Sequence, residues 1–292
     1  MPHRFVSYTI AGETAVRVGT VVDGSVAEIT PPDPSFRAGG LAALLAQGSQ
    51  AACQAADQAI AAGKRVPLDK VRLLPPIPHP GKIICLGLNY ADHAAEGGHA
   101  KPAYPSFFMR GATSLIGHEA PLRRPRVSTK LDYYEAELAL VIGRRARHLT
   151  QSEALSAVAG YACFNDATLR DYQRKTPQWT IGKNFDGTGA FGPWLVPAGD
   201  LPPGASGLKI ESRLNGQVMQ RDNTANMLFP VVETLCLLTE ALTLEPGDVV
   251  VMGTPAGVGY ARTPPVWMQP GDRIEIDIEG IGVLANTVQE EA

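Results

Sequence analysis

The chain has 292 residues, of which 45% are hydrophobic and 19% are charged, and its formal net charge is −3. This composition excludes a mainly disordered chain, because a sequence of this length can bury a large core without disulfides or metal staples. The slight acidic excess is the opposite of the basic surface that nucleic-acid binders carry. The longest apolar runs fall far short of the roughly 18 residues that a membrane-spanning helix requires. We therefore expect one or two globular domains that bind neither nucleic acid nor a membrane.

The N-terminal sequence and the cysteines indicate a reducing compartment. Residues 1–5 contain no apolar core of a signal peptide. The cysteines stand far apart, and no two of them form a C-x-x-C pair. We therefore expect a cytoplasmic protein without a disulfide framework or a zinc ribbon.

The first part of the chain has the pattern of a strand pair followed by a helix. Residues 15–18 and 25–29 flank Asp23-Gly24, a dipeptide that favours a type I′ hairpin turn because both positions take positive φ. The alanine-rich residues 41–62 predict a helix that Gly63 ends. Four prolines between residues 74 and 81 then indicate an extended linker. We divide the chain there, into a small N-terminal α+β domain (1–75) and a larger domain (76–292).

The second part is predicted to be mostly β, with short helices. Residues 82–87, 135–142 and 161–164 are apolar runs of strand length. Thr150 and Glu153 have the spacing of a capping box and predict a short helix to about residue 159. Two Pro-Gly-Asp turns each precede a strand, and residues 274–279 alternate isoleucine with acidic residues. Many strands and few long helices predict a sandwich, a roll or a barrel.

A cluster of acidic residues in this part is a candidate metal site. Glu135 and Glu137 lie two residues apart in a strand pattern, so their side chains share one face. Two buried like charges repel, so this face is either wet or neutralised by a cation. Asp166, which follows another apolar run, is a third oxygen donor. Three carboxylates without nearby Cys or His favour Mg²⁺ or Mn²⁺ over Zn²⁺.

A histidine and a glutamate after the strand at 82–87 form a candidate base. His93 and Glu96 are three residues apart and lie side by side if the segment is helical. A carboxylate beside a histidine fixes its tautomer and raises its basicity, as a general base requires. An exposed helix face explains the pair equally well. Gly97-Gly98, which follow, are suited to the hinge of a lid.

Two cations and two glycine-rich segments complete the candidates. Arg170 is able to clamp a carboxylate, although an ion pair with Asp171 explains it as simply, and Lys183 on its own is most simply a surface lysine. Residues 187–192 spell G-x-G-x-x-G but lack the strand-before, helix-after context of a dinucleotide site, which we reject. Residues 253–259 lack a P-loop lysine but are able to present backbone N–H groups to a small carboxylate.

In their order along the chain, these motifs resemble the fumarylacetoacetate hydrolase (FAH) superfamily, in its acylpyruvate hydrolase and 2-hydroxyhepta-2,4-diene-1,7-dioate isomerase-like branch. The resemblance covers residues 82–288, and its specificity comes from the ordered set. The marks, besides the residues above, are Gly87-Leu88-Asn89-Tyr90, Glu135-Ala136-Glu137-Leu138, Gly160-Tyr161, Asn165-Asp166, Gly192-Pro193-Trp194, Asn215-Gly216 with Gln220, Pro246-Gly247-Asp248 and Gly253-Thr254-Pro255.

The resemblance implies a β-sandwich roll with a smaller N-terminal domain, assembled as a homodimer. It implies that Mg²⁺ or Mn²⁺ is held by the positions that match Glu135, Glu137 and Asp166. It also implies that the segment with His93 and Glu96 closes over the substrate as a lid.

The resemblance further implies a catalytic lysine and several substrate contacts. Lys183 matches a lysine beside the metal and substrate, and Arg170, Gln173 and Thr254 match substrate-contacting positions. Many relatives carry a lysine where this chain has Arg110. We expect Arg110 to bind substrate too, although arginine is not an interchangeable cation and its contacts differ.

Together these features predict a metal-dependent hydrolase that acts on a small oxo-acid. It would cleave a C–C bond of a 2,4-dioxo acid through a metal-stabilised enolate, with a role in the catabolism of aromatic compounds. Without an attacking water, the same chemistry would tautomerise a 2-hydroxy-dienoate or decarboxylate an oxaloacetate-type acid. A non-catalytic homologue that binds a metal or a carboxylate is the remaining class.

Overall fold

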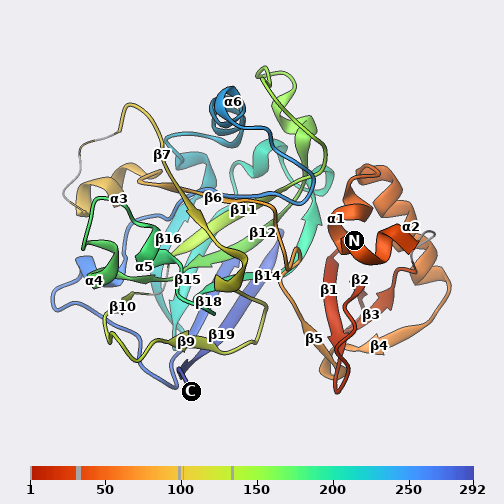
Figure 1. The fold of residues 1–292 in the computed structure, drawn as a ribbon, viewed down its shortest axis with the longest axis horizontal. Helices are drawn as coiled ribbons and strands as arrows, with labels where there is room; N and C mark the ends of the chain where they lie inside the picture. Colours follow the sequence, from red (N-terminus) through yellow and green to blue (C-terminus); the bar gives the residue numbers. More distant parts are fainter. Residues whose placement is uncertain (1, 31–33, 98–99, 101, 133–134) are drawn as a thin grey trace.

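The computed structural model describes all residues except 1, 31–33, 98–99, 101 and 133–134, and Figure 1 shows its arrangement. Its described strands form a large sheet, a smaller sheet and a two-stranded ribbon, with few long helices. This confirms the predicted mostly-β, α+β fold. The helices are α1 (Pro34–Leu45), α2 (Ser49–Ala61), α3 (Ala91–Glu96), α4 (Arg170–Gln173), α5 (Thr180–Lys183) and α6 (Val231–Ala241).

Twelve of the described strands make up the large sheet, in the order β4-β3-β2-β1-β14-β12-β11-β17-β6-β7, with β5 on β1 and β8 on β14. Their bounds are β1 (Phe5–Ile10), β2 (Arg17–Val22), β3 (Ser25–Glu28), β4 (Arg65–Pro67), β5 (Val71–Leu73), β6 (Ile83–Gly87), β7 (Ser106–Arg110), β8 (Leu115–Ile116), β11 (Ala136–Ile142), β12 (Val158–Asp166), β14 (Gly189–Pro197) and β17 (Val249–Val251).

The smaller sheet has the order β16-β15-β18-β19-β9, and β10 pairs with β13. The bounds are β9 (Leu122–Arg124), β10 (Leu131–Asp132), β13 (Thr168–Leu169), β15 (Lys209–Leu214), β16 (Gln217–Asn223), β18 (Arg273–Ile278) and β19 (Gly282–Glu290). The 3₁₀ turns are η1 (Leu68–Lys70), η2 (Ala112–Ser114), η3 (Ala154–Ala157), η4 (Ala198–Asp200), η5 (Pro203–Ala205), η6 (Thr224–Asn226) and η7 (Gly259–Ala261).

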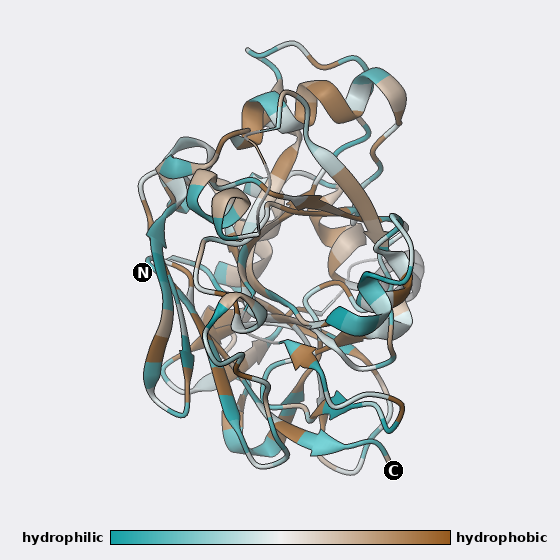
Figure 2. Ribbon diagram, turned by 90° about the vertical axis from the view of Figure 1, so that its left-hand side faces the viewer, coloured by the Kyte–Doolittle hydropathy of each residue, from teal (hydrophilic) through white to brown (hydrophobic). Residues whose placement is uncertain are grey.

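Strands β11 and β12 are buried on both faces, which explains their continuous apolar sequence. On one face, Leu138 and Leu140 pack in a core that includes residues of β15 and β18. On the other face, Ala139 and Val141 pack in a core with leucines of α1. Figure 2 colours the ribbon by hydropathy and shows brown, apolar stretches in both strands and helices. Because side chains alternate, Glu137 shares the α1 face with Ala139.

The N-terminal segment lies at one side of the molecule (Figure 1) and joins the large sheet where β1 pairs with β14 through Phe5 and Leu195. The hairpin at Asp23-Gly24 is confirmed, with φ of 46° and 71°. The division of the chain at residue 75 stays a prediction.

Two helix predictions are wrong. The stretch 41–62 belongs to two helices, α1 and α2, because Gly48 at φ 100° breaks the run between them. Half of the capping box at Thr150 is present: the Glu153 carboxylate accepts a hydrogen bond from the Thr150 N–H, but the Glu153 N–H donates to the Thr150 carbonyl oxygen and not to its hydroxyl. The predicted helix is nevertheless only the 3₁₀ turn η3, because the chain enters β12 at Val158 and pairs there with β11. Sheet pairing overrides the local helix signal.

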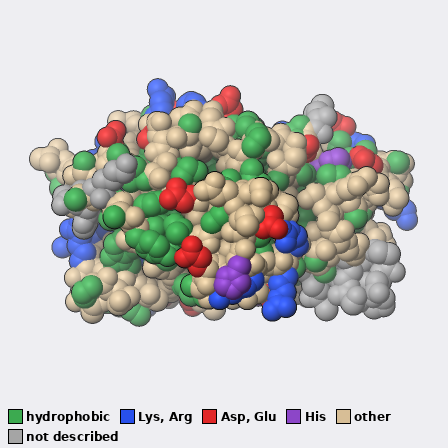
Figure 3. Space-filling model, turned by 90° about the horizontal axis from the view of Figure 1, so that it is seen from above, with side chains coloured by type: hydrophobic (Ala, Val, Ile, Leu, Met, Phe, Trp, Pro, Cys, Tyr) green, Lys and Arg blue, Asp and Glu red, His purple; other side chains and the backbone are tan. Residues whose placement is uncertain are grey.

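Other sequence expectations agree with the structure. All four cysteines are free thiols. The G-x-G-x-x-G segment leads into strand β14 and not into a helix, so the dinucleotide site is correctly rejected. No helix among the described residues is long and apolar enough to cross a membrane. On the face shown in Figure 3, acidic and basic side chains are interspersed and form no single-sign field.

Gly160 tests the close pairing of β12 and β14. A Cβ built there lies 2.3 Å from the Val196 carbonyl oxygen, and that backbone cannot yield easily. We expect Gly160→Ala to lower the free energy of unfolding by about 1–3 kcal/mol in urea titrations. Gly199→Ala is the matched control, because nothing lies within 4 Å of its Cβ position. Equal stability of the two variants would contradict this packing.

Candidate active site and metal centre

The large sheet brings the three predicted metal-binding carboxylates together. The Asp166 N–H donates to the Glu135 carbonyl oxygen, so these two residues face each other across the ends of β12 and β11. Glu137 lies two residues further along β11, on the same face as Glu135. All three are buried, and one ligand oxygen from each lies within 4.8 Å of the others. The predicted carboxylate cluster is therefore present.

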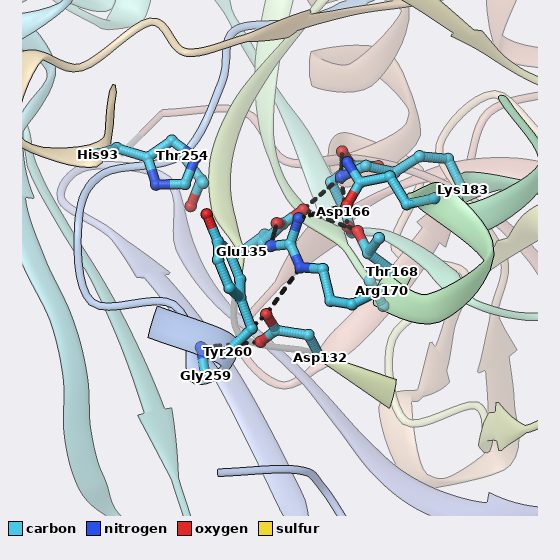
Figure 4. Close-up of polar contacts among 12 residues, drawn as sticks. His93, Asp132, Glu135, Asp166, Thr168, Arg170, Lys183, Thr254, Gly259 and Tyr260 are labelled. Atoms are coloured by element: carbon cyan, nitrogen blue, oxygen red, sulfur yellow. Dashed lines mark hydrogen bonds and ion pairs between the residues drawn. The ribbon is translucent and has the colours of Figure 1, made fainter. Parts of the chain in front are cut away.

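Two buried cations, Lys183 and Arg170, lie beside these carboxylates in Figure 4. The Lys183 Nζ lies 2.5 Å from Glu135 Oε2 and 2.5 Å from Asp166 Oδ2. Arg170 forms an ion pair with Glu135, and its Nε donates to Asp132 Oδ2 at 2.8 Å. The surface-lysine reading of Lys183 and the Asp171 pairing of Arg170 are thus wrong, since Asp171 accepts from Ser128 instead.

The electrostatics of the cluster differ from one carboxyl to the next. Burial alone would raise the pKa of Glu135, but the charges of Arg170 and Lys183 outweigh burial and lower it to about 2. Burial and the nearby charge of Asp166 raise the pKa of Glu137 well above its usual value. Burial opposes the charge on Lys183, yet Asp166 and Glu135 raise its pKa above the usual value. Lys183 is therefore an ammonium.

The donor set fits a hard divalent cation. Glu137 has no side-chain cation partner among the described residues and accepts only the Gly253 N–H, at Oε2. In this part of the site four buried carboxyl groups face three buried cations, so the protein's own cations leave one negative charge uncompensated once Glu137 is ionised; the residues are Asp132, Glu135, Glu137 and Asp166, against Arg110, Arg170 and Lys183. Buried unpaired charge is costly, and Mg²⁺ and Mn²⁺ prefer oxygen ligands. These carboxylates form a candidate divalent-metal site.

The predicted histidine–glutamate pair is also present. Helix α3 places His93 Nδ1 2.7 Å from Glu96 Oε1, and His93 is only 8% exposed. The other carboxylate oxygen of Glu96 accepts the Gly257 N–H at 2.8 Å. Held in this way, Nδ1 donates to Glu96 and Nε2 stays available as a proton acceptor. Gly98, part of the predicted hinge, lies outside the described residues.

The glycine-rich loop after β17 supplies backbone donors, as predicted for a small carboxylate, but to the protein's own side chains. Gly253 donates to Glu137, Gly257 to Glu96 and Gly259 to Asp132. Each of these three glycines thus donates a backbone hydrogen bond to one acidic side chain of the site. The loop connects the metal-binding carboxylates, the histidine pair and the Asp132 network.

A cavity of about 430 Å³ opens onto these groups. Most of the predicted site residues line it: His93, Glu135, Glu137, Asp166, Arg170, Gln173, Lys183 and Thr254. Thr254 is oriented by Gln220, whose Nε2 lies 2.8 Å from its hydroxyl. The volume suits a small acid.

Arg110 is placed differently from the prediction. Its side chain is fully buried, lies outside the residues that line the cavity, and donates to Asp166 Oδ1 at 2.5 Å and to Thr188 Oγ1 at 2.9 Å. Its guanidinium also donates to the Ala167 carbonyl oxygen. This position makes Arg110 a support for Asp166, and direct substrate contact by Arg110 stays a prediction without geometric backing.

Sequence reasoning missed three residues of the site. Asp132 accepts hydrogen bonds from Arg170, Gly259 and Tyr260, and Tyr260 lines the cavity. Thr168 donates to Glu135 Oε2 at 3.1 Å. Asp132 lies in the two-residue strand β10 and Tyr260 in the 3₁₀ turn η7, so neither belongs to a periodic pattern. The polarity of Thr168, two residues after Asp166, was the one available signal.

Helices α4 and α5 approach closely enough to place Arg170 and Lys183 around the same carboxylate. A Cβ at Gly182 would lie 2.5 Å from the backbone nitrogen of Gln173. Glycine at this position therefore allows the contact that brings Lys183 to Glu135.

Comparison with known proteins agrees with this geometry. The family profile "Fumarylacetoacetate (FAA) hydrolase C-terminal" matches residues 82–289. The chain is 35% identical over 278 residues to rat "Oxaloacetate tautomerase Fahd2a, mitochondrial", which spans 94% of this chain and 88% of that protein. The chain belongs to the fumarylacetoacetate hydrolase family. It is an enzyme of this family, it has the fold of the family, and its three clustered carboxylates form a candidate metal site.

Two solved structures are similar along their whole length. A fumarylacetoacetate hydrolase from psychrophilic Exiguobacterium antarcticum has a TM-score of 0.84 and 36% identity, covering 99% of this chain and 100% of that one. The maleylpyruvate hydrolase from Sphingobium sp. SYK-6 has a TM-score of 0.81 and 28% identity, covering 99% and 100%. The named reactions of the relatives thus include both a tautomerisation and a hydrolysis.

Glu137 tests the metal centre. We expect Glu137→Gln to weaken Mn²⁺ binding by about 100-fold or more in isothermal calorimetry, because an amide removes one charge from the ligand set. Glu240→Gln, on the exposed end of α6, is the control and should bind Mn²⁺ like the wild type. Unchanged affinity in Glu137→Gln would show that the carboxylates do not form the site.

Proposed function

We propose that the protein is a divalent-metal-dependent tautomerase that interconverts the keto and enol forms of a small 2-oxo acid of the oxaloacetate type. The observation that carries the proposal is that one cavity joins a buried oxygen-ligand cluster to a histidine–glutamate base. The rat relative named as an oxaloacetate tautomerase is similar over nearly the whole chain, which supports the same chemistry.

In this proposal one group of residues stabilises the negative charge that develops on the substrate, and another group transfers the proton. A divalent cation held by the carboxylate cluster would supply positive charge to stabilise negative charge that develops on the substrate. Lys183, as a buried ammonium, adds a second cation at that place. Gln173 and Thr254 line the cavity and offer neutral hydrogen bonds that orient the acid.

His93 acts as the base. Its Nε2 takes the proton from the carbon next to the keto group, and the electron pair of that C–H bond becomes the C=C bond of the enol. The carbonyl electron pair moves to oxygen, which then takes the proton back from the His93 imidazolium, so the base is regenerated. Glu96 stabilises the imidazolium formed in between, because its carboxylate accepts the Nδ1–H at 2.7 Å. The reverse sequence returns the keto form.

Hydrolytic cleavage of a 2,4-dioxo acid is the second candidate. The same His93–Glu96 pair is able to take a proton from water, which then attacks the 4-carbonyl before the C–C bond breaks. The similar maleylpyruvate hydrolase supports this alternative. A homodimer, a cytoplasmic location and lid closure by the α3 segment remain part of the proposal.

Removal of the metal tests the proposed chemistry. The enol form of oxaloacetate is followed by its ultraviolet absorbance, with wild-type protein before and after chelation by EDTA and desalting. We expect chelation to reduce the catalysed rate by about 10²–10³-fold and Mg²⁺ or Mn²⁺ to restore it. A full rate in the stripped protein would overturn the proposal. Release of pyruvate from acetylpyruvate, without faster enol conversion, would favour the hydrolase.

The base is tested by substitution. We expect His93→Gln to lower kcat by about 10²–10⁴-fold, because the neutral amide accepts no proton, and Glu96→Gln to cause a smaller loss. His79→Gln replaces an exposed histidine outside the cavity and should keep the wild-type rate. Wild-type kcat in His93→Gln would remove the histidine from the reaction.

A further inference from the structure

Arg174 is a cation on the cavity wall that has no carboxylate partner among the described residues. It follows α4, is exposed and lines the cavity. Within the described parts of the chain, no carboxylate oxygen lies within 4.0 Å of its guanidinium. Arg170, one helical turn earlier, is the opposite case, because Asp132 and Glu135 neutralise it and Gln173 accepts from its Nη1 at 2.7 Å. Arg174 thus keeps its charge and its N–H donors for another group.

The ring of Tyr260 holds Arg174 in place. The guanidinium carbons of Arg174 and Arg170 each lie 4.4 Å from the centroid of this ring. The Tyr260 N–H donates to Asp132 Oδ2, which fixes the base of the side chain, and Figure 4 shows the ring extending from Asp132 towards Thr254. Stacking on an aromatic face leaves the edge of a guanidinium free to form a bidentate pair with a carboxylate.

The charges along the cavity point to an acid that is anionic at both ends. At the buried end, the metal-binding carboxylates and Lys183 are arranged for the oxo-acid group. At the exposed end, Arg174 is joined by Lys175, whose ammonium lies 3.4 Å from the ring centroid of Tyr172 and which also lacks an ion-pair partner among the described residues. Positive charge at the rim stabilises a second carboxylate and contributes little to binding a neutral group.

We propose that Arg174, oriented by Tyr260, is the specificity-determining residue that binds the far carboxylate of a dicarboxylic 2-oxo acid. This assignment rests on the proposed function and names the residue that selects its substrate class. Tyr260 is a positioning residue, because it acts through Arg174.

A binding experiment tests the assignment without turnover. In the His93→Gln background with Mn²⁺ present, calorimetry gives the Kd of 2-oxobutanedioate (oxaloacetate) and of 2-oxobutanoate, which differs by the far carboxylate. We expect the further change Arg174→Gln to weaken 2-oxobutanedioate binding by about tenfold to a hundredfold. Binding of 2-oxobutanoate should stay within about twofold, which also shows that the variant is folded. Arg145→Gln removes the same charge from a site 74% exposed and outside the cavity, and should change neither Kd.

Two further variants separate Arg174 from its surroundings. Tyr260→Phe keeps the ring and should keep the preference for the dicarboxylate, whereas Tyr260→Leu should lose most of it while still binding 2-oxobutanoate. Lys175→Gln should reduce the preference less than Arg174→Gln does.

The outcomes distinguish this assignment from the proposed function. Equal weakening of both acids in Arg174→Gln, no weakening of either, or a larger effect in Lys175→Gln would overturn the assignment. Absence of enol conversion by the wild-type protein would overturn the proposed function, while the difference between the two Kd values would still test Arg174.

Discussion

The concentration of buried negative charge where β11 begins and β12 ends is the constraint on which the rest of the site depends. Like charges in a low-dielectric interior repel strongly, so the fold must bring cations to them. It does so from three separate elements, since Arg110 comes from β7, Arg170 from α4 and Lys183 from α5. The convergence of these elements on the two strands also forms the cavity. The geometry that relieves the repulsion therefore also creates the cavity that we propose as the substrate site.

The three buried cations do not pair with every buried carboxyl group of the site. Among the described residues, the Glu137 carboxyl has only the backbone N–H of Gly253 as a hydrogen-bond partner, and its pKa is raised well above the usual value. A divalent ion placed there would favour the ionised form of Glu137 and would add positive charge to the cavity. The loop that begins at Gly253 also holds Glu96, the partner of the base. The ligand cluster and the base are thus coupled through one short segment of backbone.

Sequence alone predicts the parts of this arrangement that follow a local rule. Period-two alternation places Glu135 and Glu137 on one face, the three-residue spacing pairs His93 with Glu96, and the end of an apolar run identifies Asp166. The contact between the carboxylates and the lysine depends on chain crossings far apart in sequence, and only the family resemblance anticipated it.

The features that the sequence did not predict also have physical causes. Asp132 has no pattern around it and gains its role from a loop more than a hundred residues away. The sequence does not show that Arg110 pairs with Asp166, a contact that is stabilising because a buried carboxylate is costly to leave unpaired. Substrate binding by Arg110 stays a prediction. The alanine-rich helix was overextended because Gly48 in the left-handed region outweighs the propensity of its neighbours.

The most direct test of the account is anomalous diffraction at the manganese edge from crystals of the wild-type protein soaked in Mn²⁺. The account predicts one strong peak between Glu135, Glu137 and Asp166, within about 2.2 Å of an oxygen from each. An anomalous map that is empty there, with these carboxylates held only by Lys183, Arg170 and Arg110, would contradict it.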